Sequence, residues 1–324
     1  MKAIIPVAGE GTRMRPYTYA RPKALLHVAG KPILAHILDK LEEHGIDEVT
    51  LIVGHLGDKI EEYVKSCYDF PAHFVEQTER LGIAHALFLA KKFVGAEPLF
   101  IVLGDTIFET DLEPVFKGQY TSLGIKEVED PRRFGIVALE GGFVQRVVEK
   151  PEEPETNLAL VGMYYIKDPL LLIECIEEMI EQDMKTKGEY QLTDAFEMMI
   201  GKGHRITTFG VEHWYDCGKP EALLATNRHL LELRGQDLTL GGSVVQPPVF
   251  IEESAVVKSS VIGPHVSVAA GARVQHSILR DSIIGEKAFV SNSMLDKSIV
   301  GDNAVIKGSF TRLTIGDMSE VEAL

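Results

Sequence analysis

A short repeated pattern near the carboxyl end of the chain restricts its fold more than any other feature. The pattern is an aliphatic residue, a glycine, three residues of which the third is small or aliphatic, any residue, and another aliphatic residue. Copies occur at 262–268, 284–290 and 300–306, with a weaker one at 315–321. Aliphatic residues six positions apart, with small residues at the corners, are typical of a triangular coil of short strands. We therefore predict a short left-handed parallel β-helix, with a small β-sandwich as the alternative.

The first part of the chain has a different texture, in which short apolar runs alternate with helical patterns. Strand-like runs occupy 3–8, 48–53 and 99–103, and an amphipathic helical pattern follows Pro32 and stops at Gly45. Strands that alternate with helices of this length predict an α/β fold with a Rossmann-like open, mostly parallel sheet. In such sheets, ligands bind outside the carboxyl ends of the strands.

The change from alternating strand and helix patterns to the short repeat sets the expected domain boundary. We predict a first domain over 1–240, of which 219–240 form a connecting helix, and the β-helix domain over 241–324. Glycine and proline pairs mark the entry to the second domain. Stacked coils expose apolar surface at an uncapped end, so we also expect the chain to form a homo-oligomer.

Charge and hydropathy exclude two classes of partner. The formal net charge is −15, from 33 Lys+Arg against 48 Asp+Glu, and no stretch is rich in Lys or Arg, so a nucleic acid is not expected. No apolar run approaches the roughly 20 residues that span a bilayer, so no membrane is expected. The three cysteines fit neither a disulfide framework nor a zinc pattern, which favours a cytoplasmic location.

A glycine-rich loop at 9–16 directly follows the first strand-like run. Glycines let backbone N–H groups approach an anion, and Arg13 and Arg15 add charge-assisted donors. The loop is not the dinucleotide-binding fingerprint, because Met14 stands where the third glycine would be, and no Walker A lysine follows. On its own, this pattern fits a phosphate-binding loop or a tight turn.

The loop belongs to a longer pattern that carries a family resemblance. Segments 9–18 and 22–32 read Gly-x-Gly-Thr-Arg-x-Arg-Pro-x-Thr and Pro-Lys-x-Leu-Leu…Gly-Lys-Pro. They closely resemble the signature of the nucleoside-diphosphate-sugar pyrophosphorylases, in particular glucose-1-phosphate thymidylyltransferases of the long type with a C-terminal hexapeptide β-helix. Further stretches are similar to later family blocks, in family order: 75–86, 103–106, 133–137, 148–151, 161–165, 188–194 and 214–218.

The resemblance implies a sugar-1-phosphate nucleotidyltransferase, which joins a nucleoside triphosphate to a sugar-1-phosphate and releases pyrophosphate. The favoured substrates are dTTP or UTP with glucose-1-phosphate. The alternatives are a mannose-1-phosphate guanylyltransferase and a non-catalytic regulatory homologue, although none of the expected motifs is lost. Hexapeptide acyltransferases use a coil histidine, so His265 and His276 are candidates for a second site, but surface histidines are the preferred interpretation.

The resemblance also implies roles for the residues around the phosphates. Asp105 and Asp216 are the expected ligands of Mg2+, which prefers carboxylate and phosphate oxygens. Arg13 is expected to clamp the β- and γ-phosphates, and Lys23 to neutralise charge that grows on them in the transition state.

The remaining expected contacts divide between the two substrates. On the sugar-phosphate side, Lys150 holds the phosphate and Glu149 the sugar hydroxyls, with a weaker expectation for Lys187. On the nucleotide side, the amide of Gln77 reads the base, since it offers both donors and an acceptor. Five glycines are expected to contribute close backbone contacts, Gly9, Gly11 and Gly82 to the nucleotide, and Gly135 and Gly162 to the sugar; Gly82 would let the base lie close to the chain.

Overall fold

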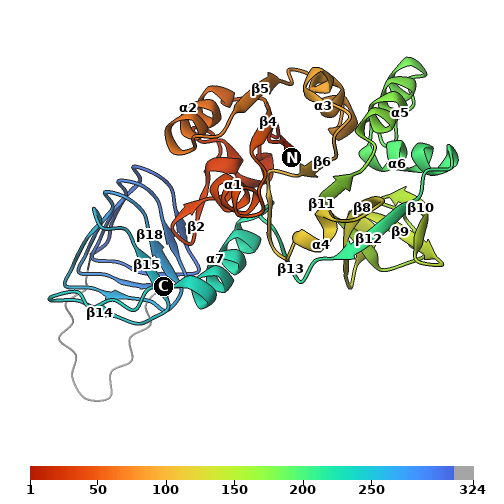
Figure 1. Cartoon of the computed structure of the whole chain (residues 1–324). Helices are drawn as coiled ribbons and strands as arrows, with labels where there is room; N and C mark the ends of the chain where they lie inside the picture. Colours follow the sequence, from red (N-terminus) through yellow and green to blue (C-terminus); the bar gives the residue numbers. More distant parts are fainter. Residues whose placement is uncertain (310–324) are drawn as a thin grey trace. The chain divides into compact units, whose positions relative to one another are not determined.

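The computed structural model of the chain describes residues 1–309, so the weak fourth repeat at 315–321 lies outside the described residues. The chain divides into two compact units (Figure 1). The first unit comprises residues 1–26 and 31–223, and the second comprises residues 27–30 and the chain from Leu224 onward. Within residues 1–309, no helix is long and apolar enough to cross a membrane.

The first unit is built on a nine-stranded sheet with the main strand order β10-β9-β11-β6-β1-β4-β5, and β8 and β12 continue from β11. β1, β4, β5 and β6 run parallel, because each is followed by a crossover, whereas β11 pairs antiparallel with β6, β8 and β9. The predicted open α/β sheet is confirmed. The strands are β1 (Lys2–Pro6), β4 (Glu48–Val53), β5 (Ala72–Glu76), β6 (Leu99–Val102), β8 (Thr121–Glu127), β9 (Gly135–Glu140), β10 (Phe143–Glu149), β11 (Leu158–Ile166) and β12 (Ile206–Gly210).

The helices of the first unit cover this sheet with apolar side chains. In α1, Ile33, Leu34, Ile37, Leu38 and Leu41 are buried, as their helical spacing predicts. The helix begins at Ile33, one residue after Pro32. The helices are α1 (Ile33–Glu43), α2 (Gly57–Cys67), α3 (Ile83–Leu89), α4 (Glu113–Phe116), α5 (Pro169–Glu181) and α6 (Leu192–Gly201).

A separate pair of strands lies outside the main sheet of the first unit. β7 (Thr106–Glu109) pairs antiparallel with β13 (His213–Asp216), and the register places Asp216 opposite Thr106. Two segments more than 100 residues apart in the sequence therefore meet at their ends. This pairing positions two of the predicted metal ligands.

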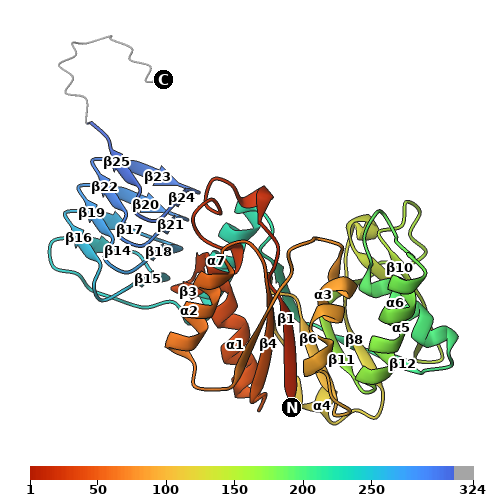
Figure 2. The same ribbon diagram turned by 90° about the horizontal axis from the view of Figure 1, so that it is seen from above.

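The second unit is a coil of short parallel strands arranged in three sheets, which Figure 2 shows stacked coil upon coil. The sheets have the orders β14-β17-β20-β23, β15-β18-β21-β24 and β16-β19-β22-β25. Inside them, aliphatic side chains such as Val266, Val274, Leu279 and Ile284 are fully buried in one column. The predicted β-helix is confirmed. Its strands are β14 (Val244–Val245), β15 (Val249–Ile251), β16 (Val256–Lys258), β17 (Val261–Ile262), β18 (Val266–Val268), β19 (Arg273–Gln275), β20 (Ile278–Arg280), β21 (Ile283–Ile284), β22 (Phe289–Ser291), β23 (Met294–Asp296), β24 (Ile299–Val300) and β25 (Val305–Lys307).

The connecting helix, α7, is shorter than the predicted range 219–240, because it spans Pro220–Arg234. It ends there because Gln236 leaves the helix to donate its backbone N–H to the carbonyl oxygen of Val249. The two compact units divide after Leu223, within this helix. The domain ranges 1–240 and 241–324 stay predictions.

One buried side chain explains why the later turns of α7 group with the second unit. Asn227 is fully buried, and its Oδ1 accepts hydrogen bonds from the backbone N–H of Ala29 (2.9 Å) and the hydroxyl of Ser267 (2.6 Å). Its Nδ2 donates to the carbonyl oxygen of His265 at 3.2 Å. A buried amide that makes three such bonds ties this part of the helix to its partners.

Candidate active site

Two adjoining cavities lie in the first unit, beyond the carboxyl ends of β1, β5 and β6. The smaller one, which we call cavity A, has a volume of about 260 Å3. It brings together five residues that the sequence assigned to nucleotide, phosphate or metal binding: Gly9, Lys23, Gln77, Gly82 and Asp105.

The larger cavity, which we call cavity B, has a volume of about 430 Å3. Asp105 lines both cavities, as do Leu103, Ile83 and Glu189. The predicted site residues that line cavity B are Arg13, Asp105, Gly135, Glu149, Lys150, Gly162 and Asp216. Four of the five residues expected on the sugar-phosphate side therefore gather in one cavity, and most of those expected on the nucleotide side in the other.

Lys23 and Asp105 face each other in this site. The Nζ atom of Lys23 donates to Oδ2 of Asp105 at 2.5 Å, and only 12% of the lysine side chain is exposed. Lys23 follows Pro22 in a single 3-10 turn (Lys23–Leu25), which limits where its stem can point. Gly11 lines neither cavity; it lies against this stem, where a Cβ atom would come within 3.0 Å of the Cβ of Lys23.

Asp216 lies beside Asp105 because of the pairing between β7 and β13. The backbone N–H of Cys217 donates to the carbonyl oxygen of Asp105 at 3.1 Å. A Cβ atom on Gly218 would lie 2.7 Å from Oδ1 of Asp216 and 3.0 Å from Nη2 of Arg13, so these two charged groups border the same glycine. The site thus combines two carboxylates with two cations.

This donor set fits a magnesium ion. Mg2+ usually binds one or two protein carboxylates and completes its octahedron with phosphate oxygens and water. Asp105 and Asp216 would supply the carboxylates. Among residues 1–309, no cluster of three or more His, Cys, Asp or Glu side chains could hold a metal ion by itself.

The other end of cavity B carries an acceptor in a fixed orientation. The side chain of Glu149 is 9% exposed; its Oε2 accepts from the hydroxyl of Thr193 at 3.1 Å, and its Oε1 lies 2.8 Å from Nζ of Lys150. Lys150 is 45% exposed and can therefore turn toward a ligand at little cost. A carboxylate held by a hydroxyl, next to a mobile ammonium group, suits a ligand that has hydroxyl groups and a phosphate.

Lys187 does not enter this arrangement. It lines neither cavity, and its exposed side chain donates to the carbonyl oxygen of Lys150 at 2.5 Å. In the structure Lys187 supports the segment that carries Lys150. Its expected contact with phosphate stays a prediction.

Gln77 and Gly82 lie together at the far end of cavity A. Gln77 directly follows β5 and is 8% exposed, and its Nε2 donates to the carbonyl oxygen of Gly82 at 3.2 Å. Gly82 has φ +105°, and a Cβ atom there would lie 2.4 Å from the carbonyl oxygen of Tyr190. The glycine is therefore required by the neighbouring backbone, a reason that the sequence alone did not reveal.

Sequence reasoning missed two charged residues that line cavity A, Arg80 and Glu189. Arg80 forms an ion pair with Glu10 of the glycine-rich loop, and Glu10 also pairs with Arg15 at 3.3 Å. Arg80 holds the pKa of the Glu10 carboxyl below its ordinary value. The acidic residue Glu10 within an anion-binding loop was the sequence signal for a cation such as Arg80, because its carboxylate needs cations beside it.

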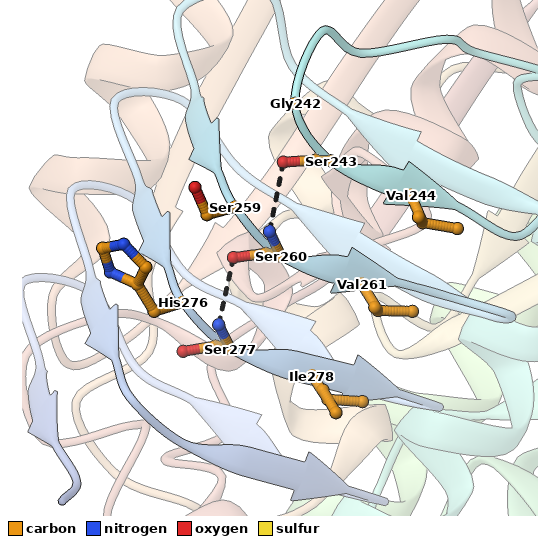
Figure 3. A pocket seen from close by; sticks show the side chains of 9 residues that line it. All are labelled: Gly242, Ser243, Val244, Ser259, Ser260, Val261, His276, Ser277 and Ile278. Carbon is orange, nitrogen blue, oxygen red and sulfur yellow. Dashed lines mark hydrogen bonds between the residues drawn. The ribbon is translucent and has the colours of Figure 1, made fainter. Parts of the chain in front are cut away.

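A further depression lies on the second unit and has a different character (Figure 3). Its volume is about 650 Å3, and a row of serines crosses it. The backbone N–H of Ser260 donates to Oγ of Ser243, and that of Ser277 to Oγ of Ser260. The hydroxyls of Ser260 and Ser277 also donate to carbonyl oxygens of their own coils. These serines bond to one another and to backbone, as expected of structural groups.

The two coil histidines have separate surroundings. His276 lines the depression, whereas Nε2 of His265 lies 3.2 Å from a carboxylate oxygen of Glu232. The structure does not bring the two rings into one cavity among those described.

The first unit thus has an open α/β sheet with cations and carboxylates beyond its strand ends, and the second unit is a hexapeptide coil. Residues 2–232 match the family model described as nucleotidyl transferase, and the chain belongs to this family. Residues 232–312 match the model described as GlmU-like, C-terminal hexapeptide.

Individual relatives match different shares of the chain. The low-salt glycan biosynthesis nucleotidyltransferase Agl11 of Haloferax volcanii is 37% identical over 72% of this chain and 66% of its own length. A glucose-1-phosphate thymidylyltransferase of Streptomyces griseus is 32% identical over 86% of this chain and 80% of its own. A crystal structure of UDP-glucose pyrophosphorylase complexed with UDP-glucose has a TM-score of 0.62 and 26% identity, and the match covers 72% of this chain and 99% of that one. The chain spans between 55 and 66% of the length of six curated relatives that it matches.

Proposed function

We propose that the chain is a sugar-1-phosphate nucleotidyltransferase, which converts a nucleoside triphosphate and a sugar-1-phosphate into a nucleotide-sugar and pyrophosphate. One observation carries this proposal most directly: cavities A and B adjoin and share Asp105. Two substrates that occupied these cavities would bring their phosphates together at the shared carboxylate.

The proposed reaction needs positioning and charge neutralisation more than covalent participation by the protein. A phosphate oxygen of the sugar-1-phosphate attacks the α-phosphorus of the triphosphate, and pyrophosphate leaves from the opposite side. Mg2+ bound to Asp105 and Asp216 would neutralise charge on the phosphates. Arg13 would hold the leaving pyrophosphate as a two-pronged donor, and Lys23 would exchange its bond to Asp105 for the transferring phosphate.

The second substrate would be oriented at cavity B. Glu149, held by Thr193, would accept hydrogen bonds from sugar hydroxyls, and Lys150 would bind the phosphate. Glucose-1-phosphate with dTTP or UTP is the proposed pair. The names of the thymidylyltransferase relative and of the solved complex with UDP-glucose support this choice over mannose-1-phosphate and GTP.

Assembly and location belong to the same proposal. Val244, Ile278 and Met294 lie on one sheet of the coil and are 55, 45 and 75% exposed, which supports self-association through the second unit. Sedimentation of the full chain tests this, and a monomer at all concentrations would contradict it. The proposed location is the cytoplasm, which is supported by three cysteines that form no disulfide in the described part of the chain.

A coupled assay of pyrophosphate release over a panel of triphosphates and sugar-1-phosphates tests the function. We expect release only when a triphosphate, a sugar-1-phosphate and Mg2+ are all present, with the highest kcat/KM for dTTP or UTP and glucose-1-phosphate. No release with any pair, from a folded protein that binds triphosphate, would favour the regulatory homologue. A clear preference for GTP with mannose-1-phosphate would establish the other alternative.

A further inference from the structure

The side-chain amide of Gln77 is held in one orientation by its neighbours. Its nitrogen lies 3.2 Å from the carbonyl oxygen of Gly82. A carbonyl oxygen can only accept a hydrogen bond, so the group that faces it must be the NH2 of the amide. The carbonyl oxygen of Gly82 thus identifies which end of this amide is the nitrogen.

The same nitrogen has a second neighbour on α3. It lies 3.3 Å from Nδ1 of His85, and the second amide hydrogen is available for this contact. Nδ1 must then be an acceptor, which places the proton of a neutral imidazole on Nε2. Both amide hydrogens of Gln77 are used within the protein, and the carbonyl oxygen Oε1 is the part that remains for a ligand.

The surroundings of His85 favour the neutral ring. Burial lowers the pKa of His85, whereas the charge of Glu79, on the loop before α3, acts in the opposite direction and is the smaller effect. On the other side, the ring of Tyr190 stacks on the imidazole with centroids 6.5 Å apart, and the Tyr190 hydroxyl donates to Asp183. Glu189, next to Tyr190, lines the same cavity as Gln77.

We infer that His85 is a positioning residue, which locks the amide of Gln77 so that cavity A accepts a base whose ring nitrogen carries a hydrogen. This inference rests on the proposed function and names its nucleotide class. Uracil and thymine carry N3–H, and guanine carries N1–H, so each can donate to Oε1. Cytosine and adenine have a bare ring nitrogen at that edge, which would face Oε1 acceptor to acceptor.

The contact between His85 and Gln77 makes nucleotide binding depend on pH. In protonated His85 both ring nitrogens are donors, so Nδ1 would oppose the NH2 group of Gln77. If the amide turned its oxygen to His85, that oxygen would leave the ligand and would also face the carbonyl oxygen of Gly82, so both orientations are disfavoured. Binding of dTTP or UTP therefore requires neutral His85, is complete above the ordinary pKa, and weakens as the pH falls through the lowered pKa of the ring.

Two variants of His85 distinguish its hydrogen bond with Gln77 from a packing role of the ring. His85→Leu removes the acceptor, whereas His85→Asn keeps an oxygen close to the position of Nδ1 and cannot titrate in this range. His73→Gln is the matched control, because His73 lies on β5, stacks on Phe93 and lines neither cavity. Equilibrium binding of UTP, dTTP and CTP is measured from pH 5 to 8, together with kcat and KM.

We expect His85→Leu to weaken UTP and dTTP binding about tenfold and CTP binding much less, since one hydrogen bond of this kind is worth about that factor. The loss should fall on KM, with kcat at saturation little changed. His85→Asn should restore the preference for UTP over CTP and remove the loss of binding at low pH. His73→Gln should behave as the unaltered protein does.

The tautomer of His85 in the ligand-free protein tests independently whether Nδ1 accepts a hydrogen bond from Gln77. Nitrogen NMR of the full chain should show the proton on Nε2, and a proton on Nδ1 overturns the inference. An unchanged ratio of UTP to CTP affinity in His85→Leu also overturns it. Absence of pyrophosphate release with every substrate pair would instead refute the proposed function, and the tautomer would still decide the orientation of Gln77.

Discussion

The two units of the chain use their polar groups in opposite ways. In the first unit, Lys23, Gln77 and Asp105 come from separate segments, and each borders a cavity where a ligand could replace or extend its contacts. In the second unit, Ser260 and Ser277 come from equivalent places in successive coils and bond to one another and to backbone. The first arrangement leaves bonding capacity for a ligand, and the second uses it up in the fold.

This contrast predicts that substitutions will separate by their effects. Removing a polar group from the first unit should reduce activity more than stability. Removing one from the second unit should reduce stability and leave the kinetic constants unchanged.

Asp105→Asn and Asp216→Asn should each reduce kcat by about a thousandfold, because a preorganised charge at the reacting phosphates is removed. The folded state should persist, since the amide has nearly the same shape. Pyrophosphate release and circular dichroism measure the two effects. Asp111→Asn is the control, because its exposed carboxylate lies beyond β7 and lines neither cavity. Near-normal rates for both variants at saturating Mg2+ would refute the metal assignment.

Lys150→Ala should raise KM for the sugar-1-phosphate about thirtyfold, as expected for the loss of a charged hydrogen bond worth about 2 kcal/mol. KM for the triphosphate should hardly change, because Lys150 lines cavity B and not cavity A. Steady-state kinetics with each substrate varied in turn provide the comparison. Lys185→Ala, which removes a lysine paired with Asp183, is the control. A parallel rise in both KM values would contradict the assignment of Lys150 to one substrate.

Asn227→Ala should lower the free energy of unfolding by about 3 kcal/mol, because it leaves buried partners without their hydrogen bonds. Neither KM should change, since Asn227 lines neither cavity. Thermal unfolding followed by assay of the folded fraction measures both quantities. Asn157→Ala removes an exposed amide bonded to Glu127 and should cost far less. A kinetic defect in Asn227→Ala at a temperature where the protein is folded would contradict the expectation that polar groups of the second unit affect stability alone.

Ser277→Ala should have the smallest effect, a loss of about 1 kcal/mol of stability, because one rung of the serine row is removed. Activity should be unchanged. Denaturant unfolding monitored with pyrophosphate release decides this. Lost activity with unchanged stability would mean that the depression of Figure 3 takes part in the reaction.

Much of the fold could be predicted from the sequence because its signals are local or periodic. The spacing of aliphatic residues and glycines predicted the coil, and the run that ends before Asp105 predicted a buried strand with a polar residue at its carboxyl end. The end of α7 could not be read in this way. It depends on a hydrogen bond from Gln236 to Val249, which lies across a turn of the coil.

The candidate site shows the same limit. The family resemblance selected Gln77, but the orientation of its amide depends on His85 and Gly82, which only the folded loop brings within hydrogen-bonding distance. Lys187 had the right sequence position for a phosphate contact, yet its side chain reaches the backbone of Lys150. Such assignments depend on where a long or symmetric side chain points, and no periodicity in the sequence encodes that direction.

The serine row of the second unit has a consequence for how such a chain can change in length. Ser243, Ser260, Ser277 and Ser293 follow one another at steps of 17, 17 and 16 residues, and each is hydrogen-bonded to the next one in the row. The hydroxyls of Ser260, Ser277 and Ser293 donate to carbonyl oxygens of their own coils. A coil inserted as a whole would thus supply its own donor and acceptor and restore the contacts that it interrupts. Lengthening or shortening by one complete coil is therefore a nearly neutral step, whereas an insertion of a few residues breaks the row at two places.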